Sequence, residues 1–127
     1  MENPLVAVQQ LGQSIWYDNI QRSLITSGDL RAMVEHDGLL GMTSNPAIFE
    51  KALTGSADYD QPMQALVEQG VGSAIDVYER LAIQDIRLAA DVLFEVYRKT
   101  EGKDGYVSLE VSPYLAHAPQ TLSLIHI

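Results

Sequence analysis

Three polar residues with chemically useful side chains each follow or end an apolar run of the chain. Asp18 closes one run, Asn45 follows a second, and Glu110 lies near the end of a third. Carboxylates can exchange protons with a substrate, and an amide can orient its hydroxyl groups. Leu109 and Val111 flank Glu110, and their side chains point to the opposite face of a strand. An acid placed in this way faces solvent or a barrel interior, and a buried acid is usually functional.

Each of these residues also has a purely structural interpretation. Asp18 can cap a turn after a strand. Asn45 stands before Pro46 and can cap a helix, a position for which Ser44 or Thr43 can compete. Taken singly, the residues therefore leave function open, and their placement in the fold has to decide it.

The three apolar runs are predicted to be parallel strands separated by helices. Strands that alternate with helical patterns form β-α-β units with right-handed crossovers, which indicates an α/β fold. In such folds the active site forms at the carboxyl ends of the strands, where all three polar residues are expected. The predicted strands are residues 14–18, 39–43 and 106–111.

Apolar residues at helical spacing predict the elements between these strands. The longest, 73–99, repeats apolar residues every three or four positions, including Ile75 and Tyr97, and is expected to bury one face. Shorter helical pieces are predicted in 1–12, 30–37, 46–52 and 63–69. A series of acids is interpreted as a solvated face: Asp58, Asp60 and Glu68.

Composition excludes several classes of protein. The 8 basic and 17 acidic residues give a net charge of −9, which argues against nucleic-acid binding, because that needs clustered Lys and Arg. No membrane span or secretory signal is recognised, so we expect a cytoplasmic location. The absence of cysteine excludes a disulfide framework, a thiolate zinc site and a cysteine nucleophile, and three scattered histidines predict no metal site. Length alone predicts one small domain.

Several short segments of the chain form a distinctive series. They are 16–20 (WYDNI), 41–51 (GMTSNPAIFEK) and 104–117 (DGYVSLEVSPYLAH), supported by 12–14, 26–28, 56–60 (SADYD) and 82–87 (AIQDIR). In their order and spacing these segments resemble transaldolase, most closely the longer bacterial and cyanobacterial type, and the resemblance extends over nearly all residues from Asn3 to His117. It implies a (β/α)8 TIM barrel that cleaves ketose phosphates through a Schiff base, without a metal or an organic cofactor.

The resemblance also implies roles for individual residues. Asp18 is similar to the strand-one acid that takes and returns the proton of the substrate hydroxyl beside the bond being broken. Asn45 is similar to the strand-two amide that binds the dihydroxyacetone part of the donor, and Thr43 and Ser44 are predicted to bind substrate with it. Glu110 is similar to the strand-three acid that transfers protons through a water while the imine forms and hydrolyses.

The family's Schiff-base lysine lies on strand four, and this chain has no counterpart of it. Its lysines are Lys51, Lys99 and Lys103, none of them expected at the carboxyl end of a strand. Because a complete barrel needs about 250 residues, we expect about three β/α units, truncated before strand four. Residues 1–117 are then the N-terminal portion of the barrel. Residues 118–127, a divergent tail, resemble adapter-derived, non-native sequence.

As a separate molecule the chain is expected to be inactive, with sugar phosphates as the substrates of its parent enzyme. The sequence leaves its oligomeric state open. Two other interpretations remain at this stage. One is a glycosidase-like barrel fragment with Asp18 and Glu110 as an acid/base pair. The other is a non-catalytic acidic α/β interaction module in which Asp18 and Asn45 are caps.

Overall fold

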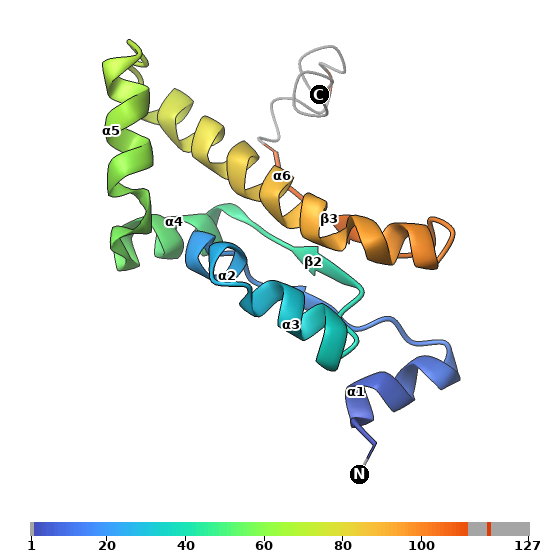
Figure 1. Ribbon diagram of the computed structural model, residues 1–127. Coiled ribbons are helices and arrows are strands. Elements are labelled where there is room, and N and C mark those ends of the chain that lie inside the picture. The colour runs from blue at the N-terminus through green and yellow to red at the C-terminus, as the bar shows by residue number, and fades with distance from the viewer. Residues whose placement is uncertain (1, 112–116, 118–127) are drawn as a thin grey trace.

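A computed structural model describes residues 2–111 and 117 and contains a small parallel sheet (Figure 1). The strand order is β1-β2-β3, and both neighbouring pairs are parallel. This arrangement confirms the predicted alternation of strands and helices in an α/β fold. The strands are β1 (Trp16–Asp18), β2 (Gly41–Thr43) and β3 (Tyr106–Val107).

Helices fill the connections between the strands, and α6, with 26 residues, is the longest of those in the connection from β2 to β3. Among residues 2–111 and 117, every helix is too short or too polar to cross a membrane. The helices are α1 (Pro4–Ala7), η1 (Val8–Leu11), α2 (Arg22–Thr26), α3 (Asp29–His36), α4 (Pro46–Gly55), η2 (Ala57–Tyr59), α5 (Asp60–Glu68) and α6 (Ala74–Lys99).

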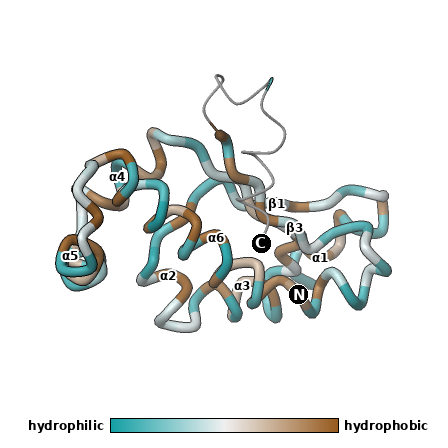
Figure 2. Tube along the Cα trace, turned by 90° about the horizontal axis from the view of Figure 1, so that it is seen from above, coloured by the Kyte–Doolittle hydropathy of each residue, from teal (hydrophilic) through white to brown (hydrophobic). Residues whose placement is uncertain are grey.

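One face of the sheet is covered by helices α2, α3 and α6, which lie together on that side of the strands (Figure 2). The side chains of Tyr17, Met42 and Val107 point from the three strands into this layer. A second, smaller cluster joins α4, η2, α5 and the first turns of α6. The main core contains Ile20, Ile25, Leu30, Leu39, Met42, Phe49, Ala82, Ala89, Leu93 and Val96.

The opposite face of the sheet carries more exposed side chains. Trp16 is 37% exposed and Tyr106 is 46% exposed, at the same level of the sheet as Gly41. The Trp16 ring lies over Gly41, where an added Cβ atom would approach the ring to 2.3 Å. Only glycine fits there without displacing the ring. The indole Nε1 also donates a hydrogen bond to Asp104 Oδ1 at 3.2 Å.

The third strand is shorter than the sequence predicts. It ends at Val107, because its neighbour β2 ends at Thr43 and the chain then turns into α4. The last contacts between the two segments are the Ser108 N–H to the Met42 carbonyl at 2.9 Å and the Ser44 Oγ to the Ser108 carbonyl at 2.7 Å. The prediction of a strand through 111 is therefore wrong beyond Val107.

Two further differences from the sequence analysis concern the helices. Helix α2 was not predicted, since its five residues are too few to show a helical period. In α6 the bounds agree closely with the prediction, but Ile75 is 69% exposed and Tyr97 is 41% exposed. Both lie near an end of α6, and neither belongs to the two core clusters.

Candidate functional site

Asp18 lies at the carboxyl end of β1, directly beside the end of β2. The parallel register pairs it with Thr43, whose Oγ1 donates a hydrogen bond to Asp18 Oδ1 at 2.7 Å. The carboxylate remains exposed. Its position suits proton exchange with a molecule from solvent, because one oxygen is held by the protein while the side chain stays accessible.

Asn45 caps helix α4. Its backbone is extended, Pro46 occupies the first helical position, and its Oδ1 accepts a hydrogen bond from the Ile48 N–H at 2.9 Å. This is the capping geometry that the Asn-Pro pair favours. Because the cap uses the carbonyl oxygen of the side chain, the amide nitrogen is the group with which Asn45 can donate a hydrogen bond to a ligand.

Ser44 and Glu110, like Thr43, lie outside the lining of the pocket described below. Ser44 is 3% exposed, and its hydroxyl donates to the Ser108 carbonyl. Glu110 lies three residues beyond the end of β3, and its side chain is exposed. The structure thus brings Asp18, Thr43 and Asn45 close together, with Glu110 at the same end of the sheet.

An open pocket of ≈ 510 Å³ lies between Asp18 and helix α4. Sequence analysis did not place Glu50, Lys51 and Thr54 there. The available signal was helical spacing, because Ala47, Lys51 and Thr54 recur at intervals of four and three residues after the Asn45 cap. The full lining is Asp18, Asn45, Ala47, Ile48, Glu50, Lys51 and Thr54.

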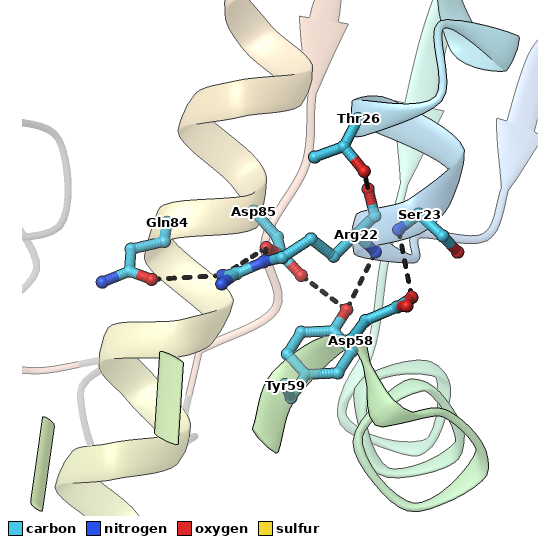
Figure 3. Close-up of polar contacts among 7 residues, drawn as sticks. All are labelled: Arg22, Ser23, Thr26, Asp58, Tyr59, Gln84 and Asp85. Carbon is cyan, nitrogen blue, oxygen red and sulfur yellow. Dashed lines mark hydrogen bonds and ion pairs between the residues drawn. The ribbon is translucent and has the colours of Figure 1, made fainter. Parts of the chain in front are cut away.

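A buried ionic cluster lies behind the strands, among α2, η2 and α6 (Figure 3). Asp85 is 0% exposed, its Oδ1 accepts a hydrogen bond from Arg22 Nε at 2.7 Å, and the same oxygen forms an ion pair with Arg22 Nη2 at 2.6 Å. Its Oδ2 accepts a hydrogen bond from the Tyr59 hydroxyl at 2.6 Å. The guanidinium also lies 5.1 Å from the centre of the Tyr59 ring. Both carboxylate oxygens are therefore engaged within the protein.

Burial sets the ionisation of this cluster. It raises the pKa of Asp85, while the hydrogen bonds from Tyr59 and Arg22 act in the opposite direction. Burial, together with the neighbouring Asp85, raises the pKa of the Tyr59 phenol far above its ordinary value. The phenol thus stays protonated and serves as a hydrogen-bond donor to Asp85.

Asp58 belongs to the same region, although it was expected on a solvated face. Its Oδ2 accepts hydrogen bonds from the Ser23 N–H at 3.1 Å and from Gln21 Nε2 at 3.4 Å. Hydrogen bonding with Ser23 lowers the pKa of Asp58. The expectation holds for Asp60 and Glu68, which are exposed, but is wrong for Asp58.

Comparison with known proteins decides the family. Residues 15–122 match the family model described as Transaldolase/Fructose-6-phosphate aldolase. The chain belongs to this family. It is 48% identical over 114 residues to the Transaldolase of Trichodesmium erythraeum, which covers 90% of this chain and 30% of that protein. It is 50% identical over 115 residues to Transaldolase 2 of Nostoc punctiforme, covering 91% of this chain and 30% of the relative.

A further relative gives the same result. The Transaldolase of Neisseria gonorrhoeae is 49% identical over 113 residues, covering 89% of this chain and 32% of that protein. The chain therefore spans less than a third of the length of these relatives. With its three parallel strands and intervening helices, it matches the N-terminal part of a transaldolase (β/α)8 barrel.

Proposed function

We propose that this chain is the N-terminal part of a transaldolase that transfers a dihydroxyacetone unit between sugar phosphates. The donor is sedoheptulose 7-phosphate or fructose 6-phosphate, and the acceptor is erythrose 4-phosphate or glyceraldehyde 3-phosphate. The reaction belongs to the cytoplasmic, non-oxidative pentose phosphate pathway. The observation that carries the proposal is that Asp18 and Asn45 line one pocket, with Asp18 held by Thr43, in a chain of this family.

The proposed roles follow from what each side chain can reach. Asp18 takes the proton of the hydroxyl next to the breaking carbon–carbon bond and returns it to the acceptor aldehyde. The electron pair of that bond moves to a protonated lysine imine, which becomes an enamine. Asn45, with its oxygen held in the cap, uses its amide nitrogen to orient the dihydroxyacetone unit. Thr43 fixes the Asp18 carboxylate, and Ser44 fixes the segment around Ser108.

Glu110 is proposed to move protons through a water during formation and hydrolysis of the imine. Imine formation releases one water when the lysine amine condenses with the substrate ketone, and hydrolysis consumes one. An exposed carboxylate at the same end of the sheet suits this exchange.

The imine-forming lysine is proposed to lie on a further strand that this chain does not contain. Lys99 is the last residue of α6, and Lys103 lies in the turn before β3. Lys51 lines the pocket with Asp18, but it projects from a helix beside the strand ends and is exposed. We propose that none of the three replaces the missing lysine.

A chimeric enzyme tests the proposal. Residues 1–111 replace the matching segment of the Trichodesmium erythraeum transaldolase, which supplies the remainder of the barrel. We expect dihydroxyacetone transfer from fructose 6-phosphate to erythrose 4-phosphate. Glu110→Gln in this chimera should lower kcat by about 100-fold with an unchanged thermal transition, since proton transfer by a placed side chain contributes roughly 10²–10⁴-fold. A folded chimera without turnover would contradict the proposed function.

The 127-residue chain by itself gives the complementary test. It should show no turnover and should trap no borohydride-reducible adduct with fructose 6-phosphate. Among the described residues β1 and β3 each pair with β2 alone, so two strand edges stay open, and the chain should self-associate. An adduct located on Lys51 by peptide mass spectrometry, or a monodisperse and cooperatively melting monomer, would count against this part of the proposal.

A further inference from the structure

Two segments that the proposed reaction does not use converge at the start of helix α2 (Figure 3). One is 56–60, which contains η2, and the other is 82–87 in the middle of α6. Both reach the first turn of a helix that begins four residues after Asp18. Their convergence there indicates that both segments fix the position of the first turn of α2.

Helix α2 takes its N-terminal cap from this distant part of the chain. Its own N-cap residue, Gln21, makes no side-chain capping hydrogen bond. The Arg22 N–H donates instead to the Tyr59 hydroxyl at 3.0 Å, and the Ser23 N–H donates to Asp58 Oδ2 at 3.1 Å. First-turn N–H groups need such acceptors, because they have no partner within the helix.

The capping hydroxyl is itself fixed in place. Tyr59 is 1% exposed and donates its proton to Asp85, which is held in turn by the Arg22 guanidinium. A hydroxyl that donates to Asp85 presents its lone pairs elsewhere, and one of them accepts the Arg22 N–H. Arg22 therefore closes the cluster with both its backbone and its side chain.

The segment between this cap and Asp18 is short and has little freedom. It consists of Asn19, Ile20 and Gln21, of which Ile20 is 0% exposed in the main core and Gln21 donates to Asp58. A shift at the first turn of α2 must therefore be absorbed within three residues, close to the Asp18 carboxylate.

We propose that Tyr59, with Asp58 and Asp85 around it, is a positioning residue that aligns Asp18 for proton transfer. The inference rests on the proposed transaldolase function and adds to it a group outside the pocket. Tyr59 touches no reacting atom; it acts through the α2 cap and the three-residue connection to the strand.

A double-mutant cycle in the chimera tests this inference. Tyr59→Phe keeps the ring in the core and removes only the hydroxyl. We expect kcat to fall about tenfold, with KM changed less than twofold. In the Asp18→Asn background the same substitution should leave the residual kcat unchanged, because no carboxylate remains to be aligned. A merely structural role would lower both rates by the same factor, and that result would overturn the proposal, as would an unchanged kcat.

Two further variants complete the test. Tyr97→Phe removes a hydroxyl from an exposed ring on the same helix layer and should leave kcat unchanged. Asp58→Ala removes the cap of Ser23 from the more accessible side of the cluster, and it should lower kcat several-fold with the same dependence on Asp18. It provides the cycle if the Tyr59 variant does not fold.

Amide hydrogen exchange separates failure of this inference from failure of the proposed function. If the folded chimera has no turnover, the transaldolase proposal is wrong. The exchange rates still test whether the Tyr59 hydroxyl caps α2. Tyr59→Phe should speed exchange at the amides of residues 19–23 by about tenfold and leave α3 unchanged. Equal protection in both proteins would overturn the positioning role.

Discussion

The acidic residues at the carboxyl ends of the strands and the acidic residue buried in the helical layer have opposite surroundings. Asp18 and Glu110 are exposed, and Asp18 receives one described hydrogen bond, from Thr43. Asp85 is fully buried, and Arg22 and Tyr59 occupy both of its oxygens. A carboxylate whose acceptors are filled by the protein organises structure, whereas one with an oxygen left to solvent can meet a substrate. Burial and hydrogen-bond partners thus distinguish these two kinds of carboxylate.

The buried Arg22–Asp85 ion pair also shows why solvent exposure matters for folding stability. Forming such a pair costs the hydration of both charges, so its net contribution to folding is small. Removing only one partner is different, because the remaining charge stays buried without compensation. For an exposed carboxylate at the end of a strand, water can replace a hydrogen-bond partner that a substitution removes. The comparison therefore predicts that substitutions in the buried cluster change stability strongly and that substitutions of exposed residues at the strand ends change it little.

The largest effect is expected for Asp85→Ala. It leaves the Arg22 guanidinium buried without its partner and should lower the free energy of unfolding by about 3–5 kcal/mol. Urea denaturation of the chimera measures this. Asp91→Ala, an exposed position on the same helix, is the matched control and should change stability by less than about 0.5 kcal/mol. Equal costs at both positions would break the comparison.

A second variant sharpens the cause of that loss. Replacing both charges, Arg22→Met with Asp85→Leu, should recover much of the stability lost by Asp85→Ala, because no uncompensated charge remains. If the double variant is as unstable as the single one, the cluster contributes through specific hydrogen bonds and not through charge compensation.

The next effect concerns alkaline pH. Burial raises the pKa of Tyr59 and also that of Tyr78. Above about pH 10 the unfolded chain loses these protons while the folded chain keeps them, so the unfolded state binds fewer protons and stability falls as pH rises. The slope is about 1.4 kcal/mol per pH unit for each proton. Urea midpoints of the chimera between pH 8 and pH 11 should fall less steeply in Tyr59→Phe; an identical slope would contradict this.

The smallest effect on stability is expected for Asn45. Asn45→Ala removes the α4 cap and should cost about 1 kcal/mol, whereas Asn45→Ser keeps a capping oxygen and should cost little. Both remove the amide nitrogen, so both should raise the KM for fructose 6-phosphate in the chimera. If Asn45→Ser leaves KM unchanged, Asn45 is a cap only.

Much of the candidate site could be predicted because strand ends leave a local signal. Asp18 and Asn45 each follow an apolar run, and β1 and β2 were placed correctly in outline. Asp85 was missed, although it lies three residues after Ala82 and four before Ala89 on the buried face of α6. That spacing marks it as an acid on an apolar face. Its partners could not be found in this way, since Arg22 and Tyr59 are distant in sequence.

The length of β3 and the role of Asp58 also lay beyond local patterns. A strand continues only as far as its neighbour offers hydrogen bonds, and β2 turns into α4 after Thr43. Asp58 resembles any surface acid until η2 places it against the first turn of α2. Both depend on contacts between segments that the hydrophobic period does not encode.

The sequence by itself determined the alternation of strands and helices, the family resemblance, the acid at the end of the first strand and the amide after the second. These properties depend on hydrophobic period and on short motifs, which are local. Only the tertiary structure decided that Asp18 is held by Thr43, that Lys51 lines the same pocket, and that Tyr59 and Asp85 secure the start of α2. Those contacts depend on strand register and helix packing, which bring distant residues within hydrogen-bonding distance.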